Sequence, residues 1–387
     1  MLIVARLVQG VGAALMIPQV LSGIQLNFSG SARARAIGLY AVALSGGAVA
    51  GQVLGGALIS ANLFGSQWRP IFLINVPIGL APVAGALRFL PVDHGGRSKR
   101  LDLWGVAALS ATVLLAVTPL ILGRDQGWPA WTWVCLVASL PALGLFIAVE
   151  RRVAAHGGYP LINLRVLTRP AISWGLAANA AAQSAYFALL FILALYLQQG
   201  LGQSPLSSGL TLISWVAAFG IAGPVLPRLP ARLTPLVPPG GYVILATAYL
   251  GLCAVLLTRH AEGTPLIALL GVGGFGLGTG FSALVAYLTA AAPPHYAPDM
   301  SGLITTTSQL AAVLGVAAFG TVYLSLAPHP GPRVAMRAFT IVTAGFALAA
   351  LLAAVAAYRS THTPAAADAS GADAADGNAQ APARNES

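Results

Sequence analysis

The chain has 387 residues, of which 57% are hydrophobic and only 8% are charged, and its formal net charge is +10. A soluble domain carries about 25% charged residues and could not bury so large an apolar share in its core. These values exclude an ordinary soluble protein and predict an all-α, polytopic membrane protein whose solvent is lipid. The positive charge does not indicate nucleic-acid binding, because no basic run is interleaved with aromatic residues.

Apolar stretches long enough to cross the hydrocarbon core recur along the whole chain. Proline, glycine and charged residues gather in the short connections between them. We therefore expect eleven transmembrane helices, near residues 1–25, 35–60, 70–90, 101–123, 130–150, 170–198, 206–226, 238–258, 264–291, 300–326 and 335–358. The first stretch has no basic region before its apolar core, so we interpret it as a span and not as a signal peptide.

The distribution of basic residues predicts the orientation of these spans. The connections after the first, third, fifth and seventh spans hold twelve Arg and Lys residues, and the alternate connections hold five. Because basic residues favour cytoplasmic loops, we place residue 1 outside the membrane and the C-terminal tail in the cytoplasm. The tail, residues 359–387, is rich in Ala, Asp, Gly and Pro without periodicity, which predicts disorder.

The first span carries a positive charge. Arg6, Gln9 and Gly10 share one face of the expected helix. An arginine inside the membrane is costly and usually faces a cavity or a partner. The alternative is that Arg6 snorkels to the outer headgroups, and the sequence leaves both possibilities open.

The second span contains a glycine pattern. Gly47, Gly51 and Gly55 are spaced by four residues, and Gly56 adjoins the last of them. Small residues at this spacing let two helices approach closely. Plain helix packing is the competing explanation for the pattern.

The third span contains Asn75 and Pro77. Pro77 has no N–H to donate to the carbonyl of Leu73, so we expect a kink at this point. The kink is a candidate gating element, and a purely structural kink is the alternative.

Polar residues recur on single faces of two later spans and are candidates for a substrate cavity near the midplane. Hydrogen bonding between helices is the competing explanation for each of them. The cavity candidates are Asn179, Gln183 and Tyr186 in one span, and Thr305 and Gln309, with Ser301 and Ser308 nearby, in the other.

Two further features are interpreted as structural. The glycine run from Gly271 to Gly280 is preceded by no strand and followed by no Lys-Ser/Thr pair, so it indicates helix packing and not a phosphate loop. Asp102 precedes an apolar span and is expected to cap its N-terminus.

The remaining chemistry argues against an enzyme. None of the ten acidic residues lies deep in an expected span, and no embedded histidine, paired carboxylate or Ser-His-Asp set is apparent. Cys135, Cys253 and the six scattered histidines lack metal-binding spacing. We expect no catalytic site, no metal and no cofactor.

Five stretches in order resemble the fourteen-helix drug/proton antiporters of the major facilitator superfamily, the EmrB/QacA type. They are ARLVQGVGAALMIPQ, SGGAVAGQVLGGAL, WRPIFLINVPIG, YLQQGLGQSPLSSGL and SGLITTTSQLAAVLGVAAFG, and the likeness runs over about residues 1–358. One departure is Gln52, where the glycine motif of the family usually has proline after Gly51. The missing proline removes a bend, so a straighter second helix is expected.

The resemblance implies a division of the chain. Residue 1 would begin the fourth helix of the family, and the first three helices would be absent. Residues 1–90 would be a partial N-terminal bundle, 101–150 two central linker helices, 170–358 a six-helix C-terminal bundle and 359–387 the tail. In the family, the proton-carrying acid and the cytoplasmic Asp-Arg signature lie in the stretch that this chain lacks.

The resemblance also implies a function, the efflux of small amphipathic molecules by proton antiport across the cell membrane. It assigns Arg6, with Gln9 and Gly10, to proton coupling, and Gly47, Gly51, Gly55 and Gly56 to the antiporter motif between the two bundles. The implied partners are a small-molecule substrate, protons and the lipid bilayer. The rival hypotheses are a truncated or degenerate transporter without flux, and a membrane-embedded assembly partner that binds other helices through its glycine faces.

Overall fold

The computed structural model describes residues 2–28, 30–61, 65, 69–89, 102–158, 160–162, 164–228, 230–258, 263–291, 297–329 and 331–363. Within these residues every regular element is a helix, which confirms the all-α class. Nine helices in the described part of the chain are long and apolar enough to cross a membrane. Two further helices, α1 (Leu2–Asn27) and α2 (Gly30–Ala61), occupy the places of the first two expected spans.

The remaining helices follow the expected order closely. The third span is divided into α3 (Pro70–Leu73) and α4 (Asn75–Phe89), and a short helix, α7 (Leu164–Leu167), was not expected. The others are α5 (Leu103–Leu122), α6 (Ala130–Ala155), α8 (Pro170–Leu195), α9 (Pro205–Val225), α10 (Val237–Leu257), α11 (Thr264–Ala291), α12 (Ala297–Leu326) and α13 (Pro332–His362).

Local chemistry explains several of these boundaries. Proline begins α8, α9 and α13, where its missing N–H is not needed by the helix. Asp102 caps α5 as predicted, because its side chain accepts a hydrogen bond of 2.9 Å from the backbone N–H of Gly105. The last helix continues through His362, which is four residues past the expected end of the last span at residue 358. Residues 364–387 lie outside the described residues.

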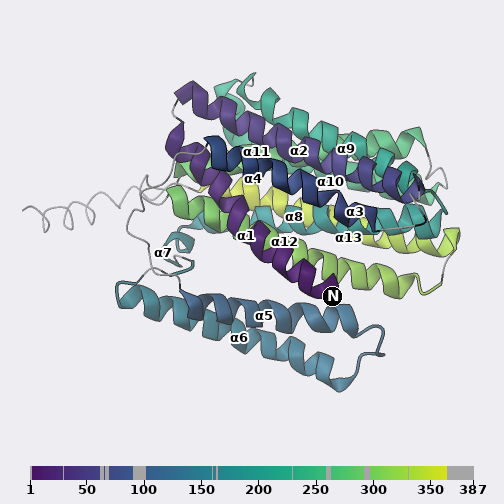
Figure 1. The fold of residues 1–387 in the computed structure, drawn as a ribbon, viewed down its shortest axis with the longest axis horizontal. Coiled ribbons are helices and arrows are strands. Elements are labelled where there is room, and N and C mark those ends of the chain that lie inside the picture. Colours follow the sequence, from purple (N-terminus) through teal and green to yellow (C-terminus); the bar gives the residue numbers. More distant parts are fainter. Residues whose placement is uncertain are drawn as a thin grey trace, which may run out of the picture.

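The largest buried apolar cluster lies in the C-terminal bundle of α8 to α13. Helix α8 packs against α12 and α13, and α10 packs against α11 and α13 (Figure 1). The glycine run of α11 makes this packing possible. A methyl group at Gly278 would lie 2.6 Å from the carbonyl oxygen of Phe219 on α9, and one at Gly276 would lie 2.6 Å from the backbone nitrogen of Leu245 on α10. The run therefore serves helix packing, as the sequence predicted.

The first helices lie along the surface of this bundle (Figure 1). Helix α2 packs against α9, whereas α1 contacts α12 and α2. Helix α2 is one unbroken α-helix, in agreement with the effect expected of Gln52 in place of proline.

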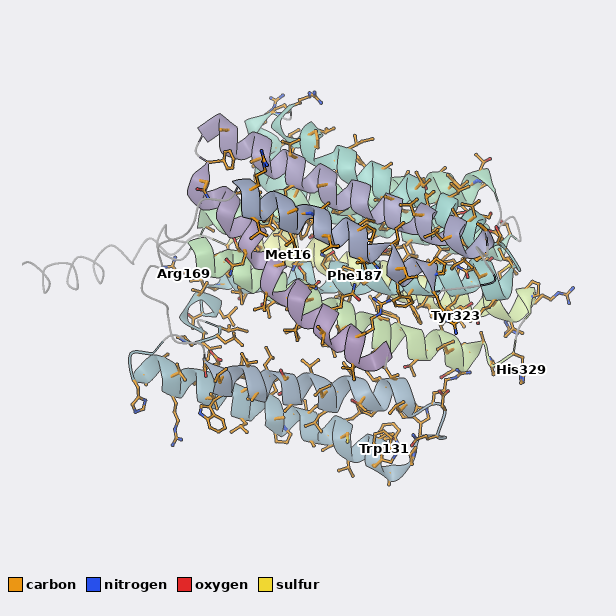
Figure 2. The ribbon with its side chains drawn as sticks, viewed as in Figure 1. Met16, Trp131, Arg169, Phe187, Tyr323 and His329 are labelled. Atoms are coloured by element: carbon orange, nitrogen blue, oxygen red, sulfur yellow. The ribbon has the colours of Figure 1, made fainter. Side chains whose placement is uncertain are left out.

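Helices α5 and α6 form a separate hairpin that touches the bundle through α12 (Figure 1). Large apolar side chains cover the outer surfaces of the hairpin and of α1. Met16 on α1 is 60% exposed and Trp131 on α6 is 36% exposed (Figure 2). Such surfaces are expected of helices whose solvent is lipid.

Candidate functional site

Arg6 on α1 is held by two neighbours. Its Nη1 donates a hydrogen bond of 2.8 Å to Oε1 of Gln9, one turn along the same helix. Its guanidinium carbon lies 4.5 Å from the ring centroid of Phe72 on α3. A cation over an aromatic face is worth about 0.5–1 kcal/mol at an exposed site. The structure thus connects the Arg-Gln stretch of α1 to α3, although no carboxylate among the described residues pairs with Arg6.

Gly10 lies one residue beyond Gln9 and is exposed. No atom would lie within 4 Å of a methyl group built on it. At Gly10 the helix is therefore uncovered by the described part of the chain, whereas Arg6 on the same face contacts Phe72.

The glycine pattern of α2 divides into two parts. A methyl group at Gly56 would lie 2.8 Å from Cα of Leu206 and 2.8 Å from the carbonyl oxygen of Pro205, at the start of α9. Gly47, Gly51 and Gly55 have no atom within 4 Å of the corresponding position. Gly56 alone of the four requires glycine for contact with the C-terminal bundle, and the other three stand on an open stripe of α2.

Asn75 and Pro77 lie at the interruption between α3 and α4. Helix α3 ends at Leu73, and Nδ2 of Asn75 donates a hydrogen bond of 3.1 Å to the carbonyl oxygen of Ile71. Pro77 can supply no N–H to Leu73, so the break falls where the sequence predicted a kink.

The polar candidates of α8 and α12 are used in different ways. Asn179 is fully buried, and its Nδ2 donates a hydrogen bond of 2.9 Å to Oγ of Ser308. The hydroxyl of Thr305 donates to the carbonyl oxygen of Ser301 in its own helix, at 2.8 Å. The Asn179–Ser308 bond joins α8 to α12. For Asn179 this supports the competing explanation, hydrogen bonding between helices.

Two glutamines among the cavity candidates are not fully buried. Gln183 is half-buried on α8, and Gln309 is exposed on α12. These two amides keep surface that a solute could contact.

Tyr186 lies in an aromatic stack between α8 and α9. Its ring is parallel to those of Trp215 and Phe219, with centroid distances of 5.8 and 6.3 Å. Trp215 is fully buried, whereas Tyr186 and Phe219 are half-buried. The stack gives the half-buried edge of α8 a flat apolar surface beside Gln183.

A buried carboxyl pair at the start of α5 was missed by the sequence analysis. Helix α6 runs past the expected end of its span, to Ala155, and buries Glu150 completely. Oε2 of Glu150 accepts a hydrogen bond of 2.9 Å from the backbone N–H of Ile162. Within the described part of the chain, Oε1 of Glu150 and Oδ2 of Asp102 are both buried without a hydrogen-bond partner, and both would contact a methyl group built on Gly105.

The described residues offer no other chemical centre. They contain no group of three His, Cys, Asp or Glu side chains that could hold a metal ion. Cys135 and Cys253 are free and half-buried.

Comparison with known proteins identifies relatives over most of the chain. Residues 1–316 match the model of the Major Facilitator Superfamily. The chain is 36% identical over 333 residues to the "Probable actinorhodin transporter" of Streptomyces coelicolor, covering 84% of this chain and 57% of that protein. It is 31% identical to the "Methyl viologen resistance protein SmvA" of Salmonella typhimurium (82% and 63%) and 29% identical to the "Methylenomycin A resistance protein" of Streptomyces coelicolor (83% and 66%). The chain thus spans between about half and two thirds of the length of these relatives.

Proposed function

Because the chain belongs to the Major Facilitator Superfamily, we propose that it acts as a multi-pass cell-membrane transporter that exports small amphipathic molecules in exchange for protons. The tail after α13 lies in the cytoplasm in this proposal, as the distribution of basic residues predicts. The proposed units are residues 1–90 as part of an N-terminal bundle, 101–150 as a linker hairpin and 170–358 as the C-terminal bundle. The fourteen-helix type, with this chain supplying helices 4 to 14, is part of the same proposal.

The contact between α2 and α9 is the observation that carries the mechanism. At Gly56 the two bundles touch backbone to backbone, whereas the stripe of Gly47, Gly51 and Gly55 meets no described atom. Helix α2 packs along α9, so this helix pair can serve as the axis about which the two bundles rock, and its closest point is the backbone contact at Gly56. Rocking of two bundles about such a contact would give the midplane alternating access to the two sides.

Arg6 is the proposed proton-coupling charge. Gln9 and Phe72 fix the position of its guanidinium without neutralising its charge. A fixed positive charge favours the ionised form of a nearby carboxyl and so controls when that carboxyl releases its proton. Asn75 and Pro77, at the break between α3 and α4, are the proposed gating kink on the same side of the pathway.

The proposed substrate path is lined by Gln183, Thr305 and Gln309, and Tyr186 supplies its aromatic surface. Asn179 belongs to this path only as the residue that fixes α8 to α12. The relatives named for the transport of actinorhodin and for resistance to methyl viologen and methylenomycin support export of small molecules. Amide and aromatic groups suit such molecules, because they offer hydrogen bonds and flat apolar contact without a fixed charge.

The proposal is tested in proteoliposomes that contain the purified protein and ethidium as the transported probe. An imposed proton gradient is expected to drive ethidium against its own gradient, and a protonophore is expected to abolish this movement. Gly56→Ala is expected to reduce the rate severely, because the added methyl group would overlap the backbone of Leu206 and Pro205. Gly46→Ala on the same helix, where a methyl group meets no atom within 4 Å, is the matched control.

Two outcomes would contradict the proposal. Wild-type proteoliposomes that move no ethidium and no methyl viologen, with protein that is folded and inserted, would favour a role without flux. Equal rates for the Gly56→Ala and Gly46→Ala variants would remove the α2–α9 contact from the mechanism.

A further inference from the structure

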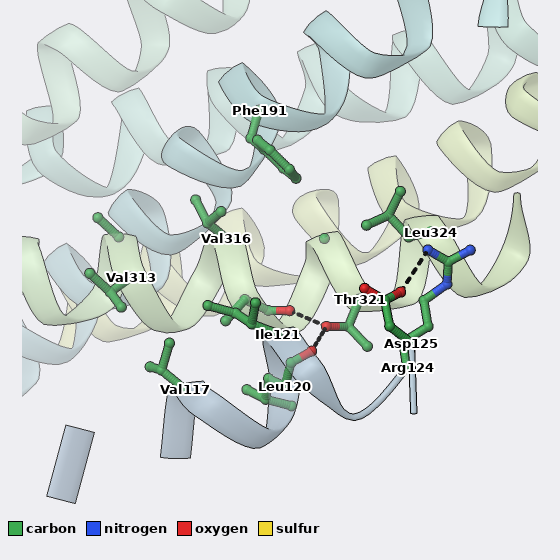
Figure 3. A pocket seen from close by; sticks show the side chains of 13 residues that line it. Val117, Leu120, Ile121, Arg124, Asp125, Phe191, Val313, Val316, Thr321 and Leu324 are labelled. Carbon is green, nitrogen blue, oxygen red and sulfur yellow. Dashed lines mark hydrogen bonds and ion pairs between the residues drawn. The ribbon is translucent and has the colours of Figure 1, made fainter. Parts of the chain in front are cut away.

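An apolar groove separates the linker hairpin from the C-terminal bundle (Figure 3). It lies between α5 and α12, has a volume of about 630 Å³, and receives the ring of Phe191 from α8. Pockets that hold single small molecules have volumes of about 300–1,000 Å³. The groove shares α8 and α12 with the proposed substrate path, but none of the residues proposed for that path lines it.

The walls of the groove offer almost no polar group. Val117, Ile121, Val313 and Val316 supply aliphatic surface. The hydroxyl of Thr321 lies 2.6 Å from the carbonyl oxygens of both Leu120 and Ala317, so it is already occupied (Figure 3). Between α5 and α12 a ligand would therefore meet mainly hydrocarbon.

The groove is also open toward the lipid side of the helices. Ile121 is 59% exposed, Val313 is 44% exposed and Phe191 is 41% exposed. In a bilayer such surfaces are covered by acyl chains. The occupant of this groove thus reaches it from the membrane.

One end of the groove carries a pair of opposite charges. Arg124 and Asp125 follow the C-cap residue of α5, Gly123, and Nη1 of Arg124 lies 4.0 Å from Oδ1 of Asp125. Their side chains are 30% and 77% exposed (Figure 3). A contact of this length between exposed groups is weak, so both ions remain available to other partners.

Aromatic residues place this charged end at the membrane surface. Trp128 and Trp133 have ring centroids 5.6 Å apart, and Nε1 of Trp131 donates a hydrogen bond of 3.1 Å to Gln126. Tryptophan is enriched at the level of the lipid headgroups. Arg124 and Asp125 lie in the same connection, so they are at headgroup depth.

We infer that this groove is a site for one phospholipid with a zwitterionic, ammonium-bearing headgroup. An acyl chain fills the groove between α5 and α12, the phosphate accepts hydrogen bonds from Arg124, and the headgroup ammonium pairs with Asp125. Arginine binds phosphate through two parallel N–H groups, which gives this end of the site its preference for a phosphate ester. Bound lipid would join the linker hairpin to the bundle, which the hairpin touches mainly along α12 in the described part of the chain.

The test is native mass spectrometry of the purified full chain with phosphatidylethanolamine, phosphatidylcholine and phosphatidylglycerol added in turn. We expect phosphatidylethanolamine to be retained best, because phosphatidylcholine cannot donate a hydrogen bond to Asp125 and phosphatidylglycerol has no cation. Arg124→Gln is expected to weaken its binding about fivefold, the factor that corresponds to one basic residue at a membrane surface.

A second pair of variants tests the groove itself. Val313→Trp fills the groove and is expected to abolish lipid retention. Val322→Trp on the same helix replaces a valine that is 45% exposed but does not line the groove, and it is expected to retain lipid as the wild type does.

Three results would overturn the inference. One is equal retention of the three lipids, and another is retention that survives both Arg124→Gln and Val313→Trp. The third is competition between ethidium and the lipid, with transport lost in Val313→Trp, which would assign the groove to the substrate path. Wild-type protein that retains phosphatidylethanolamine but transports no ethidium would count against the proposed function and leave the lipid site intact.

Discussion

Replacing Glu150 with glutamine should stabilise the protein at high pH. Oε1 of Glu150 and Oδ2 of Asp102 are buried, have no hydrogen-bond partner among the described residues and crowd the same face of Gly105. Because both oxygens contact one methyl position, they lie within about 5 Å of each other, and two full charges at that distance repel by about 3 kcal/mol at an effective dielectric constant of about 20. Glutamine removes one charge and keeps a carbonyl oxygen for the N–H of Ile162, and its amide can donate to Asp102.

We expect Glu150→Gln to raise the free energy of unfolding by about 1–3 kcal/mol at pH 8, or roughly 1–4 °C in Tm for a chain of this size. The assay is thermal unfolding of the purified protein in mild detergent, repeated at several pH values. The gain should shrink as the pH is lowered, because a protonated Glu150 can donate the same hydrogen bond to Asp102. Asp125→Asn is the control, since Asp125 is 77% exposed and its removal should leave Tm nearly unchanged.

A glutamine variant that is less stable than the wild type at every pH would refute this reasoning. It would mean that the carboxylate of Glu150 is balanced by a positive charge and that its removal leaves that charge buried.

Three further predictions follow from single contacts. Gly274→Ala should greatly lower the yield of monodisperse protein on size-exclusion chromatography, because the added methyl group would overlap the backbone of Trp215 on α9. The control is Gly144→Ala, whose methyl group meets no atom within 4 Å, and this variant should behave as the wild type. Asn179→Leu should lower the free energy of unfolding by about 0.6–1.7 kcal/mol. Adding Ser308→Ala should lower it little further, because both changes remove the same hydrogen bond. The Tm values of the single and double variants check this. Arg6→Lys should slow proton-driven ethidium transport several-fold in proteoliposomes despite the retained charge, because lysine lacks the planar guanidinium that stacks on an aromatic ring. An unchanged transport rate in that variant would indicate that Arg6 only anchors α1 at the membrane interface.

Local sequence patterns located the helices well. The expected spans 264–291 and 206–226 correspond to α11 (Thr264–Ala291) and α9 (Pro205–Val225). This agreement has a simple cause, because span length is set by the bilayer and proline marks helix starts within the sequence itself. The packing role of the glycine run in α11 was predictable for the same reason, since its spacing alone defines two small-residue faces.

The pairings between helices could not be predicted in this way. Asn179 meets Ser308 across 129 positions of sequence, and Thr321 meets Leu120 across 201. Only the arrangement of α8, α12 and the linker hairpin brings these residues together. A periodic pattern shows which face of a helix is polar, but not which residue faces it, so the groove beside Thr321 had no signal in the sequence.

The carboxyl pair was missed for a related reason. Glu150 stood at the expected end of a span, next to two arginines, where exposure is the usual outcome. Helix α6 continues to Ala155, and the segment with Ile162 folds back over the glutamate. The signal that would have found it is the contact with Gly105, which the sequence does not contain.

The most direct test of the proposed function is to measure proton movement during transport. The purified protein is reconstituted with a pH-sensitive dye trapped inside the vesicles, and an ethidium gradient is imposed without a proton gradient. Proton antiport predicts a change in internal pH opposite in direction to the movement of ethidium, at a fixed ratio, and no such change in protein-free vesicles. Movement of ethidium with a constant internal pH would contradict the proton coupling, and the absence of both would contradict transport by this chain.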